Sequence, residues 1–234
     1  MSVTGHDCIH AQLPPLASQR SAQRYAPPEK ATATNGNADA ALPLRIFVSA
    51  DSLSSDPDKA CFAAGDRYAP FTGSSSSTCT ALDVITDAKR TMLLETLMPE
   101  ATAAFSSLLR VQRVQGPLVL QSMRCGYGGG VPVPGAHRTA GVAADFVIYI
   151  TARPIDVGGE TIAYSGHCEQ DQHGRPIAAH FNWSPRHLPA VADAWTTRYL
   201  VRVAMHELTH ALVFSAPLLA ARKAARPLLG QLSP

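Results

Sequence analysis

The pattern of apolar and polar residues predicts several strands and one long helix behind a polar leader. Residues 44–48 alternate as in a half-buried strand, and residues 145–151 are apolar enough to lie inside a sheet. Residues 160–165 and 176–183 are two further predicted strands around a His-Gly turn. Apolar residues recur with the helical period over residues 195–214. Because strands and helices are interspersed, we expect an α+β fold around one sheet.

Two further helices and a short strand are predicted between these segments. One helix is expected over residues 86–97, behind a capping Thr-Asp pair, and another over residues 99–109, opened by a proline. Residues 118–120 have the character of a strand. Residues 51–80 are polar and rich in turn-forming residues, so we expect a long loop there.

A glycine-rich run extends from Cys125 to Gly130. It lacks the G-x-G-x-x-G spacing and the following helix of a phosphate-binding loop. We therefore expect a flexible loop at this position.

The first 43 residues differ in composition from the rest of the chain. Residues 11–43 are rich in Ala, Pro, Ser, Thr, Gln and Asn and show little apolar periodicity, so we expect a leader that need not pack. Residues 1–15 have no apolar segment after a basic start, and we expect no secretory signal there.

Composition and charge limit the remaining function classes. The 234 residues, 46% of them apolar, can bury one sizeable core. The net charge of +2 provides no basic stripe, so we expect no nucleic-acid partner. No apolar run is long enough to cross a bilayer.

The cysteine count leaves two interpretations open. No C-x-x-C pair is present, so a structural zinc knuckle is not expected. An odd count suggests two disulfides and one remaining thiol, whereas a reducing compartment would keep all the thiols reduced and buried. Four paired cysteines allow three pairings, and the sequence alone does not choose among them. The cysteines are Cys8, Cys61, Cys79, Cys125 and Cys168.

The candidate chemistry lies on the predicted helix at residues 195–214, which contains the motif HELTH. His206 and His210 are four residues apart and share a helical face, so both imidazoles can bind one zinc ion. Glu207 lies one step round the helix, where it can act as general base toward a zinc-activated water. A surface helix with two idle histidines is the alternative, but the residues around the motif are mostly apolar, and burying these polar groups without a role is costly.

A zinc protease centre needs three protein ligands and an open fourth position. The residues after His210 include no His, Asp or Glu, so a third ligand from downstream is not present in this chain. Upstream candidates are His137, His167, His173, His180 and His187.

The sequence HELTHALVFS resembles the active-site helix of the leishmanolysin family, the major surface proteases of kinetoplastids, which are metzincins. The segments LRIFVSADSL, STCTALDVITDAKR, LMPEA, VQRVQG and DFVIYITARP, and the stretch from Cys168 to FNWSP, occur in the family's order over about residues 44–216. The resemblance implies a metzincin-like N-terminal subdomain with a mixed, twisted sheet. It also implies a zinc endopeptidase that cleaves polypeptides with one Zn²⁺ per chain. The complete protein is expected to be secreted or associated with the membrane or cell surface.

The resemblance also assigns roles to the cysteines. The family's propeptide carries a His-x-Cys-x-His segment, to which residues 6–10 are similar, so Cys8 is expected to be a zymogen switch that binds the zinc. Residues 1–43 then form a propeptide-like leader, residues 44–216 the catalytic subdomain and residues 217–234 a divergent tail. The implied disulfides are Cys61–Cys79 and Cys125–Cys168.

The chain departs from the family in three respects. The family has a glycine where this chain has Val213, and β-branched valine resists a positive φ. Residues beyond about 216 are unlike the family, so the third histidine, the methionine turn and the C-terminal subdomain are missing. Neither a signal peptide nor a lipid-anchor signal is seen. We expect an incomplete leishmanolysin-type zinc endopeptidase; the alternative is a catalytically inactive family fragment or paralogue that acts as a surface or adhesion protein.

Overall fold

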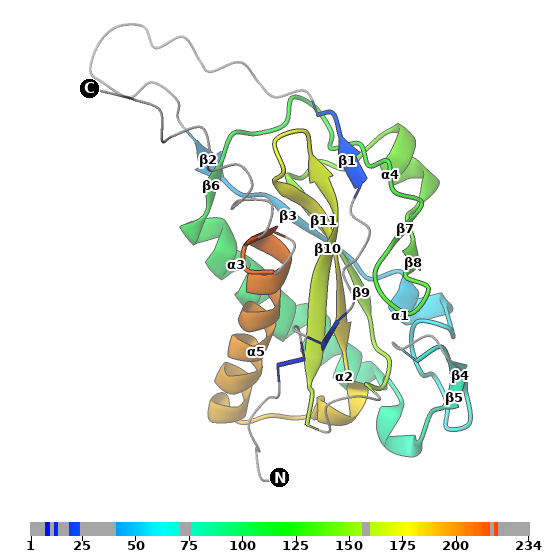
Figure 1. Ribbon diagram of the computed structural model, residues 1–234. Helices are drawn as coiled ribbons and strands as arrows, with labels where there is room; N and C mark the ends of the chain where they lie inside the picture. The colour runs from blue at the N-terminus through cyan, green and yellow to red at the C-terminus, as the bar shows by residue number, and fades with distance from the viewer. Residues whose placement is uncertain are drawn as a thin grey trace, which may run out of the picture.

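The fold is organised around a five-stranded mixed sheet. A computed structural model describes residues 8–9, 12–13, 19–23, 41–70, 76–155, 160–215 and 218–219. The sheet has the order β1-β10-β11-β9-β3 (Figure 1). The α+β class is confirmed. The strands are β1 (Gln19–Ser21), β3 (Ile46–Ser49), β9 (Phe146–Thr151), β10 (Ala163–Asp171) and β11 (Pro176–Trp183).

Strand β9 is buried on both faces, which explains its continuous run of apolar residues. Phe146, Ile148 and Ile150 face the helices, within the larger apolar core. Val147 and Tyr149 face the opposite way, into a second core formed with the loops between residues 114 and 144. A strand covered on both sides has no solvent face on which polar residues could alternate.

Strands β10 and β11 form the antiparallel hairpin that the sequence predicts, although β10 begins later and extends further than expected. The connecting turn contains Gly174 at φ +80°, a conformation that favours glycine. Strand β9 pairs in parallel with both β11 and β3. The mixed sheet therefore combines one antiparallel pair with parallel pairs.

One continuous helical segment stands where the sequence predicts two helices. It consists of α2 (Asp87–Thr91), the π-helical turn η3 (Met92–Leu97) and α3 (Met98–Leu108). The prediction of a break before Pro99 is wrong. Proline has no N–H to donate, but the wider π-helical turn that precedes it accommodates this loss, so the helix continues. Met98 accordingly donates its N–H to the carbonyl of Leu93, five residues earlier.

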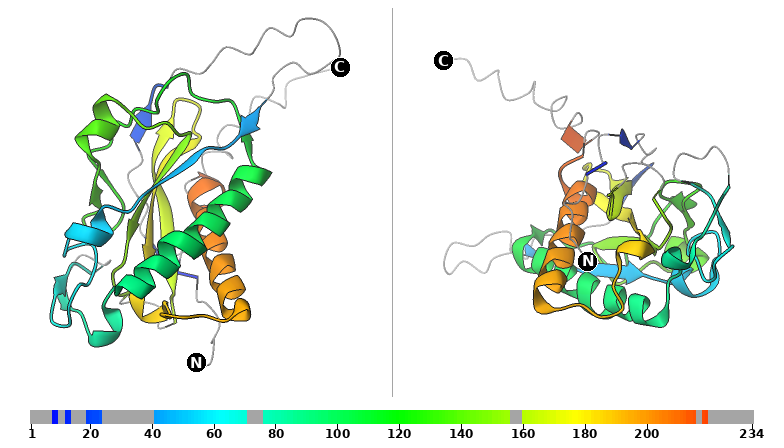
Figure 2. Two further views of the ribbon diagram at one scale, coloured as in Figure 1. Left: turned by 180° about the vertical axis from the view of Figure 1, so that it is seen from behind. Right: turned by 90° about the horizontal axis from the view of Figure 1, so that it is seen from below.

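The longer helices cover one face of the sheet. Helix α5 (Ala194–Leu212) packs on β10 and β11 and also contacts α3. Seen from behind, α2 and α3 cross the sheet obliquely beside α5 (Figure 2). Among the described residues, no helix is long and apolar enough to cross a membrane.

Short elements complete the fold. The region predicted as a long loop at 51–80 includes a helix and a hairpin, and the predicted strand at 118–120 is reduced to a single bridge from Leu118 to Val142. The short elements are α1 (Ser52–Ser55), α4 (Gly135–Thr139), η2 (Ala81–Asp83), η4 (Pro185–His187), β2 (Leu42–Pro43) paired with β6 (Arg110–Val111), β4 (Arg67–Tyr68) with β5 (Ser77–Thr78), and β7 (Arg124–Cys125) with β8 (Val131–Pro132).

The described leader residues pack on the core, contrary to the prediction from their composition. Strand β1 pairs in parallel with residues 169–171 of β10 and covers that edge of the sheet. Ile9 and Leu13 are buried against Tyr127 and Tyr164. These two apolar side chains lie four residues apart. This helical spacing within a polar segment was the one sequence signal that could have predicted their burial.

A buried ion pair joins the beginning of β3 to the beginning of β9. The carboxylate of Asp145 is fully buried and accepts hydrogen bonds from the backbone N–H of Arg45 (3.0 Å), its Nε (3.0 Å) and its Nη2 (2.9 Å). Burial acts to raise the pKa of Asp145, but the hydrogen bonds and charge of Arg45 outweigh it, so the pKa lies below its usual value.

The Asp145→Asn variant should lose about 2 kcal/mol of unfolding free energy at neutral pH, because hydrogen bonds to a charged group are lost from a buried position. Since the folded pKa is lowered, the stabilisation is present above the unfolded pKa and disappears as the pH falls through the folded pKa. Urea unfolding at neutral and acid pH measures both effects. The control is Asp87→Asn, which breaks an exposed pair with Arg90 and should change stability by less than about 0.5 kcal/mol. Equal losses for the two variants would contradict the assignment.

Candidate metal centre

Helix α5 carries the HELTH motif on a well-anchored framework. Asp193 caps the helix, because its side chain accepts a hydrogen bond from the backbone N–H of Thr196 at 2.7 Å. In the middle of the sheet, the hydroxyl of Ser165 on β10 donates to the backbone carbonyl of Glu207. This contact fixes the position of the HELTH motif along strand β10.

The two histidines of the motif face each other one turn apart. Their Nε2 atoms are 3.1 Å apart, and their ring centroids are 4.7 Å apart. The Nδ1 atom of His210 lies 2.7 Å from the carbonyl oxygen of Phe214. A proton on Nδ1 is donated to that carbonyl, which leaves the Nε2 lone pair of His210 for a metal.

Cys8 lies at the same point, although it is 202 residues from His210 in the sequence. Its Sγ atom is 3.3 Å from the Nε2 of His210. The ligand atoms of Cys8, His206 and His210 all lie within 4.8 Å of one another. A thiolate and two imidazoles form a donor set that suits zinc, so the residues present fit this ion.

Glu207 lies beside this cluster. Glu207 is only 2% exposed, and its Oε1 atom is 4.0 Å from the Nε2 of His206. The side chain of His206, by contrast, is 46% exposed. The carboxylate is therefore close to the donor atoms and on the protein side of them, and the histidine opens toward solvent.

The described upstream histidines lie elsewhere, outside the cluster. His137 contacts the hydroxyl of Tyr149 at 2.8 Å, and burial lowers its pKa. Burial also lowers the pKa of His167 to about 4. His180 is fully buried against Thr151, and its pKa lies well below its usual value because of burial and then the charge of Arg153.

Two more of the predicted candidates are surface features. His173 lies in the turn between β10 and β11, and His187 ends η4. Of the proposed switch segment at residues 6–10, only Cys8 and Ile9 belong to the described residues. The predicted tail at residues 217–234 lies almost wholly outside them.

Helix α5 ends without the glycine expected from the resemblance. Val213 has φ −138°, so valine takes this position without entering the left-handed region. The N–H groups of Val213 and Phe214 both donate to the carbonyl of Thr209, each at 2.9 Å. This ending directs the carbonyl of Phe214 back toward His210, a role that sequence reasoning missed because it belongs to a backbone atom.

Two disulfides support the parts of the chain around the sheet. They join Cys61 to Cys79 and Cys125 to Cys168, which are the pairs that the resemblance implies. Cys8 is in neither disulfide, and its thiol is the one placed at the histidines.

Comparisons with known proteins identify the family of this chain. The sequence profile described as Leishmanolysin matches residues 6–226. The chain belongs to the leishmanolysin family. The match extends from the segment around Cys8 to beyond helix α5, so both parts of the candidate metal cluster lie within the matched region.

Individual members of the leishmanolysin family show the extent of the similarity. The chain is 34% identical over 175 residues to leishmanolysin of Leishmania major, which covers 74% of this chain and 28% of that protein. With leishmanolysin of Leishmania donovani it shares 30% identity over 223 residues, covering 90% and 36% respectively. A leishmanolysin-like peptidase of Drosophila melanogaster is 40% identical over 80 residues. The chain thus spans roughly a third of the length of its Leishmania relatives.

Proposed function

We propose that this chain carries the latent zinc centre of a metalloendopeptidase that hydrolyses polypeptides. The observation that carries the proposal is the convergence of Cys8, His206 and His210 within 4.8 Å, with Glu207 beside them. Membership of the leishmanolysin family supports the assignment. Residues 44–216 would be the metzincin-like catalytic subdomain, and residues 1–43 the leader that keeps it inactive.

Each residue of the centre has a distinct role in this proposal. A bound zinc ion supplies the Lewis acidity that acidifies water and polarises a peptide carbonyl. His206 and His210 hold the ion, and the carbonyl of Phe214 keeps His210 in the tautomer that exposes Nε2. Glu207 takes a proton from the attacking water and returns it to the leaving amine.

Latency follows from the position of the leader. Cys8 adds a thiolate donor to the cluster and so occupies the place that water and substrate need. Neighbouring contacts hold it there, because Ile9 is only 1% exposed and β1 pairs with β10. Further along, the backbone N–H of Gln23 donates to the Oε1 of Gln172 at 2.8 Å. Since the leader is tethered, its effective concentration at the centre is high, and its removal opens the site.

The family resemblance also suggests where the protein acts. Leishmanolysin-type proteases work at the cell surface or outside the cell, and two disulfides are consistent with an oxidising compartment. We propose extracellular or surface-associated polypeptides as the substrates. The third histidine ligand of the active form is not among residues 211–234, so in this proposal Cys8 is the third protein donor of the latent form.

In the processed gene product, Glu207→Gln should reduce hydrolysis of a quenched fluorescent polypeptide about 100-fold or more, because a general base is lost. Zinc content, measured on the same sample, should stay at the wild-type level, since Glu207 does not belong to the donor cluster. The control is Glu100→Gln, which alters an exposed glutamate of α3 and should keep full activity. Loss of zinc from Glu207→Gln would make the residue structural, and unchanged activity would favour a non-catalytic surface or adhesion protein.

Cys8→Ser should raise the activity of the unprocessed gene product, because a serine hydroxyl is a far weaker zinc donor than a thiolate. The matched control is Gln12→Ser, which changes an exposed leader residue and should leave latency unchanged. Activity is compared before and after the leader is removed. If Cys8→Ser is as inactive as the unprocessed wild type and both are activated equally by processing, the leader blocks the site without its thiol.

A further inference from the structure

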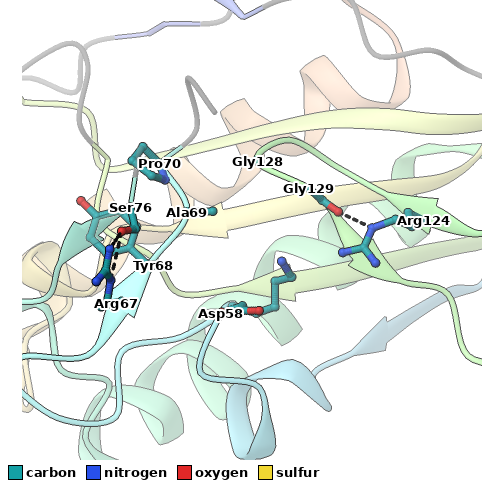
Figure 3. Close-up of a pocket in the computed structure, with 10 residues that line it drawn as sticks. Asp58, Arg67, Tyr68, Ala69, Pro70, Ser76, Arg124, Gly128 and Gly129 are labelled. Carbon is teal, nitrogen blue, oxygen red and sulfur yellow. Dashed lines mark hydrogen bonds between the residues drawn. The ribbon is translucent and has the colours of Figure 1, made fainter. Parts of the chain in front are cut away.

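A cationic surface lies away from the candidate metal cluster, where the β4–β5 hairpin faces the glycine-rich loop between β7 and β8. A cavity of about 710 Å³ opens there, lined among others by Asp58, Lys59, Arg67, Arg124 and Gly129. Figure 3 shows Arg67 and Arg124 on opposite sides of the opening, with Asp58 below them. Neither the HELTH motif nor Cys8 contributes to its lining.

Positive charge converges on this cavity from its walls and from beneath them. Lys59 is only 4% exposed, and Arg153, behind the wall, only 2%. Arg153 donates to the carbonyls of Ala69 (3.3 Å), Gly128 (3.0 Å) and Tyr127 (3.0 Å), so its hydrogen bonds to the described residues all go to neutral groups. At the rim, Arg67 donates to the hydroxyl of Ser76, and Arg124 to the carbonyls of Gly129 and Gly130.

These cations are not neutralised within the part of the chain that the structure describes. There, no carboxylate lies within ion-pair distance of Lys59, Arg67, Arg124 or Arg153, and the side chain of Lys59 makes no hydrogen bond. Burial of a cation without a partner is costly unless another group offsets it. A bound anion in the open space between these positive charges would offset this cost.

The electrostatic environment of Lys59 also favours a nearby negative charge. Its pKa is lowered, first by burial and then by the positive charge of Arg153; Asp56 opposes this shift, Arg124 adds to it, and Asp58 opposes it least. The ammonium group therefore lies in a positive potential, which disfavours its charged form. A bound anion would reverse that potential.

Both disulfides hold the walls of the cavity. Cys61 follows Lys59 closely and is bonded to Cys79, just beyond the hairpin that carries Arg67. Cys125, next to Arg124, is bonded to Cys168 on β10. The cations are therefore positioned before any ligand arrives, which lowers the entropic cost of binding.

We propose that this cavity binds a phosphate or sulfate group, with Lys59 beneath it and Arg67 and Arg124 at the rim. A tetrahedral oxyanion offers acceptor atoms in several directions, which matches donors that approach from opposite sides, and guanidinium groups bind such oxyanions well. The cavity is larger than one inorganic ion, so the group comes either as the free ion or as an ester of a larger molecule.

Thermal unfolding of the full chain in metal-free buffer tests the proposal, with sodium phosphate or sodium sulfate compared against sodium chloride at equal ionic strength. The midpoint should rise with the logarithm of the phosphate or sulfate concentration and stay constant in chloride. Equal responses to all three salts would overturn the proposal, and so would a rise that is only proportional to the phosphate or sulfate concentration, which is what exclusion of these anions from the protein surface produces. A phosphate monoester serves as a second ligand: tighter binding than that of inorganic phosphate identifies an ester, and equal binding identifies the free ion.

Variants separate a ligand-binding lysine from a structural one. Lys59→Met should raise the midpoint without added anion, because it removes a positive charge that lies close to the charge of Arg153, and should abolish the response to phosphate. A lower midpoint with an unchanged response would overturn the proposal. Should Lys59→Met fail to fold, Arg67→Gln at the exposed rim should weaken phosphate binding roughly tenfold or more. Arg198→Gln, which removes an equal charge from the exposed face of α5, is the control and should bind normally.

Discussion

The packing of helix α5 on strands β10 and β11 is the constraint on which the candidate centre depends. It buries Glu207 while His206 opens toward solvent, and the hydrogen bond from Ser165 fixes the helix against the strand. A pair of imidazoles can bind one ion only if the supporting element is rigid, since small displacements are enough to misplace donors. The helix end adds a further restraint through the carbonyl of Phe214. The chemistry of the motif is thus prepared by packing and by backbone atoms as much as by its own residues.

The leader uses the same strand for a different purpose. Strand β10 carries α5 on one face and pairs with β1 along its edge, so a single element connects the candidate centre with the leader that we propose to close it. Because Cys8 is held by neighbouring apolar contacts, its thiol is placed by structure and does not depend on zinc alone. Latency and catalysis would then share one framework, and removing the leader would leave the framework in place.

Sequence reasoning succeeded where information is local. The apolar run of β9, the hairpin of β10 and β11, and the helical period of α5 all follow from short-range patterns, and their elements are confirmed. It failed where distant segments decide the outcome. Pro99 continues a helix because the preceding turn widens, and leader residues such as Ile9 are buried by partners far along the chain. The approach of Cys8 to His210 over 202 residues was accessible only through the family resemblance. The cationic cavity assembles from three separate segments of the chain, and no single stretch of sequence indicates it.

The central claim is that one zinc ion is shared by Cys8, His206 and His210. X-ray absorption at the zinc edge, measured on the unprocessed chain loaded with one equivalent of zinc, tests it most directly. The account predicts a first coordination shell with one sulfur and two imidazole nitrogens, and the sulfur should vanish in Cys8→Ser. A shell of nitrogen and oxygen alone in the wild-type chain would contradict it.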